Sequence, residues 1–141
     1  MKVPSDTLYL PIRQIFFDQI IAGTKKVEYR EVKEGITMGR YLIKADNPSG
    51  YALNPACTEP GKVYYYNDYN GGKYPFLPKP YKYLYLAVGY AKERDTAKVE
   101  ITGYTFHPEK ILTDREGKPC FCWWVMEIHL GRVVEVHRKS R

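Results

Sequence analysis

Cysteine is scarce in this sequence, and long apolar runs are absent from it. The three cysteines, Cys57, Cys120 and Cys122, are odd in number, and the last two form C-F-C rather than C-x-x-C. This count and spacing argue against a disulfide framework and a zinc knuckle. No stretch approaches the length of a membrane-spanning helix, and the first residues, MKVPSDTLYL, lack the apolar run of a secretory signal. We therefore expect reduced thiols in a cytoplasmic protein that has no membrane partner.

Histidine is equally scarce and is scattered along the chain. His107, His129 and His137 have no carboxylate or cysteine at the spacing of metal ligands. No serine lies in the setting of a nucleophile elbow, and no internal repeat is visible. The sequence therefore predicts neither a metal ion nor a cofactor.

Tyrosine and positive charge are abundant instead. The chain of 141 residues carries 14 tyrosines and a formal net charge of +6. Positive charge attracts polyanions, and tyrosine rings can stack on bases, so the composition leans towards nucleic acid. Tyrosine is also a common strand residue, which leaves a purely structural explanation open. The length suits one domain, and we predict a single domain over residues 1–141.

A strand, a helix, a turn and a second strand are expected at the start of the chain. Residues 7–12 read as a strand, and Pro11 is suited to the first turn of a helix. Gly23 is typical of the position after a helix. The apolar face of this helix is predicted to consist of Ile12, Phe16, Phe17, Ile20 and Ile21.

Charged and apolar side chains alternate in residues 26–30, and Lys25 precedes them in the turn. Successive side chains of a strand face opposite sides, so Lys26, Glu28 and Arg30 share one face. This face could bind a charged, planar ligand, since an arginine can hold a phosphate or a base edge and a carboxylate can accept two hydrogen bonds. It could equally be a salt-bridged strand surface.

Proline and glycine dominate residues 46–79, which we predict to be an irregular insertion. A short strand is expected just before it, at residues 41–45, and at most one within it, at residues 63–66. Its tyrosines alternate with lysines, so the insertion is either a packed lid or solvated loop, or a surface for stacking bases.

Three further strands are expected after the insertion, over residues 81–90, 98–106 and 121–130, with a loop or short helix at residues 107–119. In the last strand Trp124, Met126, Ile128 and Leu130 share one side, and Trp123 faces the other. A turn or bulge at Gly131, a short strand and an unordered basic tail follow. The fold class is therefore mainly β with one or two short helices (α+β), as a small closed or partly closed β-barrel.

A family resemblance covers about residues 7–44 and 80–136. L-Y-L-P-I, the helix that ends at Gly23, and G-x-K-x-x-E-x-R at Gly23, Lys25, Glu28 and Arg30 together resemble the ASCH domain. The segments KPYKYLYLAVGY, AKVEITGYTF and WWVMEIHLGRVVEV are similar to the later strands of that family. The resemblance implies a PUA-like β-barrel that binds RNA or a nucleotide in a groove beside its first helix.

Some ASCH proteins are amidohydrolases that remove the acetyl group from acetylated cytidine. In these proteins the lysine of the motif is the base, a threonine replaces the motif glutamate as nucleophile, and a distant glutamate completes the site. The resemblance would make Lys25 the base here, with Glu28 at the position of that threonine. It assigns the distant glutamate to neither Glu109 nor Glu116.

The sequence therefore favours an ASCH-type domain that binds RNA or a nucleotide. The alternatives are an amidohydrolase of an acetylated nucleoside, with Lys25 and Glu28 as catalytic residues, and a protein-interaction module that uses the aromatic insertion. Tyr81 and Tyr90, which flank the first strand after the insertion, are candidates for stacking. The predicted binding residues are Lys25, Lys26, Glu28, Arg30, Tyr81 and Tyr90.

Overall fold

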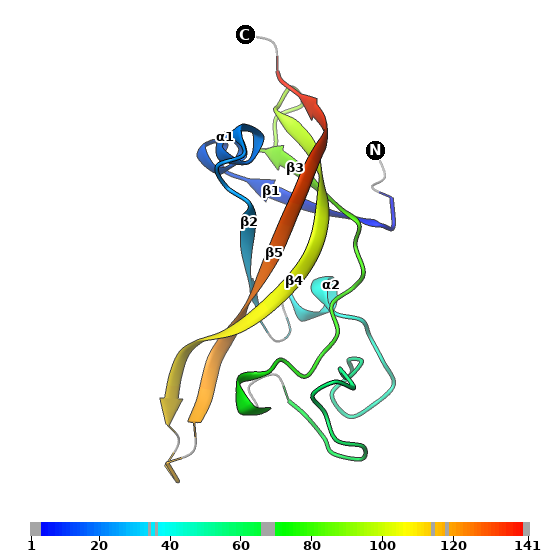
Figure 1. Cartoon of the computed structure of the whole chain (residues 1–141), viewed down its shortest axis with the longest axis vertical. Helices are drawn as coiled ribbons and strands as arrows, with labels where there is room; N and C mark the ends of the chain where they lie inside the picture. The colour runs from blue at the N-terminus through cyan, green and yellow to red at the C-terminus, as the bar shows by residue number, and fades with distance from the viewer. Residues whose placement is uncertain are drawn as a thin grey trace. The chain divides into compact units, whose positions relative to one another are not determined.

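The computed structural model describes residues 4–33, 35, 37–65, 70–113, 115–117 and 119–139, with the backbone alone for residues 110–112 and 119–122. Its α-helices and strands, labelled in Figure 1, are β1 (Thr7–Ile12), α1 (Gln14–Ala22), β2 (Val27–Val32), α2 (Met38–Tyr41), β3 (Tyr83–Val88), β4 (Thr96–Thr113) and β5 (Pro119–His137). A 3-10 turn, η1, covers Asn70–Gly72 between α2 and β3.

The five strands form one mixed sheet in the order β1-β3-β4-β5-β2. β1 runs parallel to β3, from Thr7 beside Tyr83 to Ile12 beside Val88, and β3 runs antiparallel to β4. The predicted class, mainly β with short helices, is confirmed. We expected a small closed or partly closed barrel, and the closed form is not found: closure requires every strand to pair on both sides, whereas β1 and β2 each have one neighbour among the described residues.

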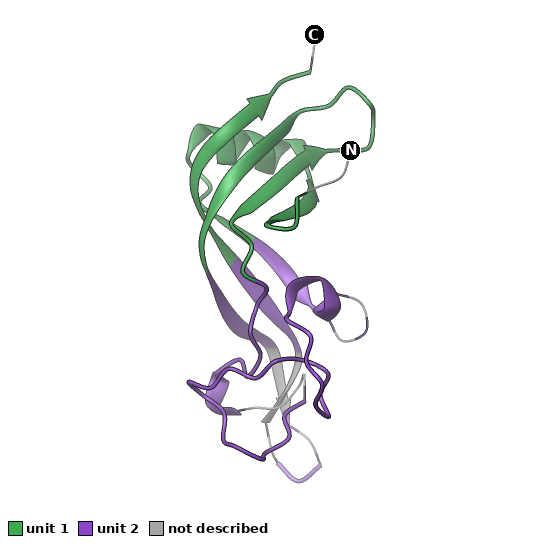
Figure 2. Cartoon of the chain, turned by 90° about the vertical axis from the view of Figure 1, so that its right-hand side faces the viewer, with its two compact units in different colours: residues 1–28, 80–103, 128–141 green, residues 29–79, 104–127 purple. Residues whose placement is uncertain are grey.

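The chain divides into two compact units, which Figure 2 colours green and purple. Unit 1 comprises Met1–Glu28, Pro80–Gly103 and Ile128–Arg141, and unit 2 comprises Tyr29–Lys79 and Tyr104–Glu127. The insertion at residues 46–79 lies wholly in unit 2. The single domain over residues 1–141 stays a prediction.

Regular strands and helix α1 build the core of unit 1. The expected strands at residues 7–12 and 81–90 are confirmed as β1 and β3. Pro11 belongs to β1 rather than to the helix, and it is tolerated because β1 is an edge strand that need not donate at every position. The buried apolar side chains of unit 1 are Leu8, Leu10, Ile12, Phe17, Ile20, Leu84, Leu86, Ala87, Ala97, Val99 and Ile128.

Helix α1 buries a narrower face than the sequence predicts. Phe17 and Ile20 are buried, whereas Phe16 is 39% exposed. Ile12 belongs to β1 rather than to the helix and is buried as part of that strand. Only the side of α1 that bears Phe17 and Ile20 therefore faces the sheet. The end of α1 is as predicted: Gly23 adopts a left-handed conformation (φ 80°), and its N–H donates to the Ile20 carbonyl at 3.1 Å.

A buried carboxylate anchors the end of the chain to unit 1. Asp95 is 1% exposed and accepts hydrogen bonds from Gln14 Nε2 (2.9 Å), Arg138 Nη1 (2.9 Å) and the Lys139 backbone N–H (2.8 Å). These hydrogen bonds, led by the one from Lys139, hold the pKa of Asp95 far below its usual range despite its burial. Residues 138 and 139 are therefore docked, and the prediction of an unordered tail is wrong for them.

Strands β4 and β5 are longer than predicted. Residues 107–113 continue β4 where we expected a loop or short helix, and β5 runs through Gly131 where we expected a turn or bulge. Pro108 is tolerated because β3 pairs only with residues 96–100 of β4. A Cβ at position 131 would lie 2.9 Å from Thr102 Cγ2, so this glycine permits close approach of the strands rather than a turn.

An aromatic cluster fastens the insertion to the sheet of unit 2. Tyr74 packs on Phe106 and Trp124, with ring centroids 4.3 and 4.8 Å apart, and on Phe76 at 5.6 Å. Tyr64, Tyr74 and Phe76 are all buried. The insertion is thus a packed layer of side chains. Its β-type backbone pairing is limited to isolated bridges, such as the one between Leu53 and Phe76.

The two short strands that we predicted in this region are not formed as such. Within residues 41–45, Tyr41 ends helix α2, and Leu42 and Lys44 form only isolated bridges. Residues 63–65 adopt no regular structure, and residue 66 lies outside the described residues. Prolines interrupt the ladder in this part of the chain, so side-chain packing replaces strand pairing.

Candidate functional site

The motif lysine and glutamate form a largely buried ion pair at the end of α1. Lys25 Nζ lies 3.6 Å from Glu28 Oε1, and the two side chains are 16% and 8% exposed. The Lys25 backbone N–H donates to the Gln19 carbonyl at 3.1 Å, which fixes the turn after the helix. Lys25 Nζ also lies 5.3 Å from the centre of the Phe16 ring. Lys25, Glu28 and Phe16 together are called the Lys25–Glu28 site below.

The charged face of β2 is the covered one. Glu28 and Val32 are buried and Arg30 is half-buried, whereas Tyr29 is 53% exposed and Glu31 is also exposed. The alternation was predicted correctly. The burial is nevertheless unusual, because an ordinary solvated strand face would leave its charges in water.

The other predicted residues do not gather around this pair. Lys26 is exposed, and its carbonyl accepts from the Leu130 N–H at 2.9 Å, which pairs the start of β2 with β5. Tyr81 precedes β3 and Tyr90 follows it, so at about 3.3 Å per residue they lie beyond opposite ends of a strand about 20 Å long. Tyr90 is 83% exposed. Arg30 belongs to unit 2.

Thr24, the threonine beside the motif lysine, has a structural role. Its hydroxyl donates to the Gln19 carbonyl at 3.2 Å, at the end of α1. Hydroxyls in this position satisfy helix carbonyls. Thr24 therefore helps to hold the turn in which Lys25 lies.

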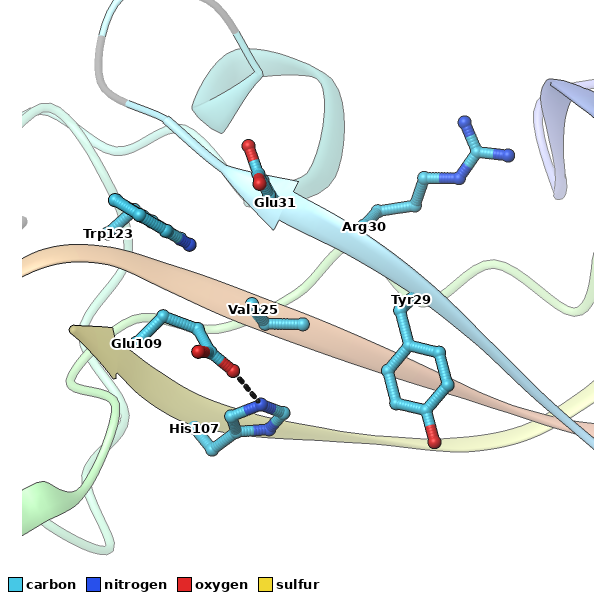
Figure 3. A pocket seen from close by; sticks show the side chains of 7 residues that line it. All are labelled: Tyr29, Arg30, Glu31, His107, Glu109, Trp123 and Val125. Atoms are coloured by element: carbon cyan, nitrogen blue, oxygen red, sulfur yellow. Dashed lines mark hydrogen bonds and ion pairs between the residues drawn. The ribbon is translucent and has the colours of Figure 1, made fainter.

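Unit 2 contains a pocket that the sequence did not predict. It has a volume of about 460 Å³ and is lined by Tyr29, Arg30, Glu31, His107, Glu109, Trp123 and Val125. These residues come from β2, β4 and β5 (Figure 3). We call it the sheet pocket. It lies on the opposite face of the strands from the aromatic cluster, because Trp123 and Val125 alternate with Trp124 and Met126.

His107 connects two glutamates at the sheet pocket. Its Nε2 lies 2.8 Å from Glu109 Oε1, and its Nδ1 lies 2.7 Å from Glu127 Oε1. Both contacts can be hydrogen bonds of ionised carboxylates only when the ring carries a proton on each nitrogen. Since the two carboxylates contact different nitrogens, they do not converge on one point. Among the described residues no group of three histidine, cysteine, aspartate or glutamate side chains could hold a metal ion.

No local sequence pattern predicts the sheet pocket, because its lining residues are far apart in the chain. Glu109 was considered only as a distant catalytic glutamate, and His107 only as a metal ligand. The one available signal was the opposite facing of Trp123 and Trp124, and the structure confirms it: Trp124 is 1% exposed, whereas Trp123 is half-buried.

Comparison with family models, curated proteins and solved structures finds no match to this chain. The ASCH resemblance therefore stays a prediction. Within the part of the chain that the structure describes, neither helix has the length and apolar character that crossing a bilayer requires.

Proposed function

We propose that this chain binds RNA or a nucleotide fragment at the Lys25–Glu28 site. The observation that carries the proposal is the burial of Glu28, which is 6% exposed, beside the Lys25 ammonium. Buried ion pairs contribute little net stability compared with apolar side chains of similar size. The burial of this ion pair beside the aliphatic core of unit 1 therefore favours a role in ligand recognition over a role in stability.

The chemistry of the pair suits a nucleotide. The Glu28 carboxylate can accept from a base amine or a ribose hydroxyl, and Lys25 can donate to a phosphate. Lys26, the next residue in the chain, is exposed and adds a second positive charge. The whole chain carries a formal net charge of +6, which attracts polyanions. The sequence also predicts a contribution from Arg30, which is tested separately below because it lies in unit 2.

Binding of a labelled single-stranded RNA, followed by fluorescence anisotropy across a salt series, tests the proposal. We expect Lys25→Met to weaken binding about tenfold and to lower the salt slope by about 0.7, the value for one phosphate contact with a single strand. Lys92→Ala is the matched control, since it removes one positive charge at an exposed position of the β3–β4 connection. Equal losses in Lys25→Met and Lys92→Ala would show that only net charge matters.

Two further variants refine the result. Glu28→Gln preserves the shape of the side chain and should alter preference among bases more than salt dependence, because it changes an acceptor and not a phosphate contact. Arg30→Ala tests the remaining residue of the motif, and we expect weaker binding with an unchanged cooperative melt. Acetylated cytidine should be included in the assay, because its hydrolysis, lost in Lys25→Met, would replace the binding proposal by the amidohydrolase alternative.

A further inference from the structure

We propose that the sheet pocket binds a single nucleobase that carries an exocyclic amine, stacked against Trp123. This inference goes beyond the proposed function, because it concerns a different set of residues and does not use the Lys25–Glu28 site. All seven lining residues belong to unit 2.

The size and walls of the sheet pocket fit a flat ring. Its volume of about 460 Å³ falls in the range of about 300 to 1,000 Å³ that is usual for small-ligand sites. Val125, which is 9% exposed, lies among the other lining side chains in Figure 3. Trp123 is half-buried and Tyr29 is 53% exposed. Base stacking on aromatic rings of this kind is worth about 1 to 3 kcal/mol per base.

The polar groups of the sheet pocket favour a hydrogen-bond donor as ligand. Glu31 and Glu109 present carboxylate oxygens. Lys33 Nζ lies 2.9 Å from Glu31 Oε2, and the contact with His107 uses only one of about four acceptor positions on Glu109. Figure 3 shows the Arg30 guanidinium pointing away from the His107–Glu109 pair. Cytosine, adenine and guanine each offer an exocyclic amine on the pairing edge, whereas uracil offers two carbonyl oxygens and a single ring N–H there. The site should therefore bind cytidine and adenosine more tightly than uridine.

His107 acts as a positioning residue for this acceptor. Its contacts with Glu109 and Glu127 hold the Glu109 carboxylate in place on strand β4. Glu127 is the better covered of the two glutamates, with its side chain 25% exposed against 43% for Glu109. The more exposed carboxylate is therefore the one available to a ligand.

A nucleobase fits these walls better than a quaternary ammonium ion does. Recognition of such cations uses a cage of ring faces around one point. The sheet pocket has only Tyr29 and Trp123 as aromatic lining residues apart from the imidazole, and its volume exceeds that of a small ammonium ion. Free tetramethylammonium is nevertheless a useful competing probe.

Titration of the full chain with the free nucleosides cytidine, adenosine and uridine tests the inference. Tryptophan fluorescence reports on the sheet pocket because Trp124, the only other tryptophan, is buried on the opposite face. We expect saturable quenching by cytidine and adenosine, and affinity for uridine at least about fivefold lower. Trp123→Ala should weaken cytidine binding about tenfold, as measured by amide chemical shifts. Tyr65→Ala removes an aromatic side chain that is 56% exposed and does not line the sheet pocket, and it serves as the matched control.

A second variant protects the test against misfolding of Trp123→Ala. Glu109→Gln keeps the shape of the side chain and should reduce the preference for cytidine over uridine at least about threefold. Equal affinity for uridine and cytidine in the wild type would overturn the inference, as would cytidine binding that both variants leave unchanged. Saturable binding of tetramethylammonium without cytidine binding would also overturn it.

Two variants distinguish failure of RNA binding at the Lys25–Glu28 site from failure of nucleobase binding at the sheet pocket. Lys25→Met should leave nucleoside binding at the sheet pocket unchanged. Trp123→Ala should leave the salt dependence of RNA binding unchanged, because it removes no charge.

Discussion

The two compact units rely on different interactions for their stability. Unit 1 combines an aliphatic core with the buried carboxylate of Asp95, which accepts hydrogen bonds from Gln14, Arg138 and the Lys139 backbone N–H. Unit 2 fastens an irregular segment with aromatic rings centred on Tyr74. Burial, with a smaller effect of Tyr51, raises the pKa of the Tyr74 hydroxyl far above its usual value. One unit therefore depends on a group that must be ionised, and the other on a group that must stay neutral.

The largest effect is expected from Tyr74→Ala. This change removes a ring that contacts Phe76, Phe106 and Trp124, and truncation of a buried aromatic side chain costs about 4 kcal/mol. Hydrogen exchange should show amides of unit 2 losing more protection than those of unit 1. Tyr65→Ala is the control, because this ring is 56% exposed. Uniform loss of protection along the chain would show that the units unfold together.

Tyr74→Phe isolates the hydroxyl of the same ring. The native pKa lies above the unfolded value of about 10, so the neutral hydroxyl contributes fully below pH 10, and its contribution is lost as the pH rises further. The variant should resist alkaline unfolding better than the wild type. An identical alkaline transition in both proteins would assign that transition to other groups.

A somewhat smaller effect is expected from Asp95→Asn. The amide cannot replace the ionic acceptor of Arg138, and the loss of such buried hydrogen bonds costs about 3 kcal/mol at neutral pH. Because the native pKa lies below the unfolded value of about 4, the carboxylate stabilises the fold above that pH and loses its effect as the pH falls. Chemical denaturation across pH should therefore show a flatter acid limb in the variant.

Asp18→Asn is the matched control for Asp95. Asp18 accepts from the same two side chains, Gln14 and Arg138, but its side chain is 51% exposed. Its hydrogen bonds with Arg138 and Gln14 lower its pKa, and water screens the interaction. If Asp18→Asn lowered the free energy of unfolding as much as Asp95→Asn does, burial would not explain the larger effect expected at Asp95.

The smallest effect is expected from Gly131→Ala in unit 1. The new methyl group would lie 2.9 Å from Thr102 Cγ2 and 3.3 Å from Glu100 Cβ, and overpacking of this kind costs about 1 to 2 kcal/mol. Thr102→Ser removes the closer methyl group and keeps the hydroxyl that donates to the His129 carbonyl. The double variant should recover part of the loss in a thermal melt. Additive losses would show that the two positions do not collide.

Local signals predicted part of this structure well. The strand β1, the end of α1 at Gly23 and the opposite facing of Trp123 and Trp124 each follow from a short repeat or one glycine. The length of β4 could not be predicted from such signals, because a proline such as Pro108 normally indicates the end of a strand. Only the structure shows that β3 pairs with residues 96–100 of β4 and not with Pro108.

The long-range features were beyond such signals. Asp95 lies in a polar stretch between two predicted strands, and no local pattern marks it for burial because its partners Gln14 and Arg138 lie 81 and 43 residues away along the chain. Of the candidate site, only the family resemblance grouped Lys25 with Glu28, and the structure places Lys25 Nζ 3.6 Å from Glu28 Oε1. The burial of Glu28 and the assembly of the sheet pocket were not, because both depend on how distant strands are brought together.

The adjacent tryptophans of β5 have a consequence for the accuracy of folding. Because successive side chains alternate, a slip of β5 by one residue would expose Trp124 and push Trp123 and Glu127 into the core. Such a misregistered molecule would bury the Glu127 carboxylate among apolar side chains, and it would therefore be unstable. The alternation of Trp123, Val125 and Glu127 with Trp124, Met126 and Ile128 thus selects one register of β5 against the alternative shifted by one residue.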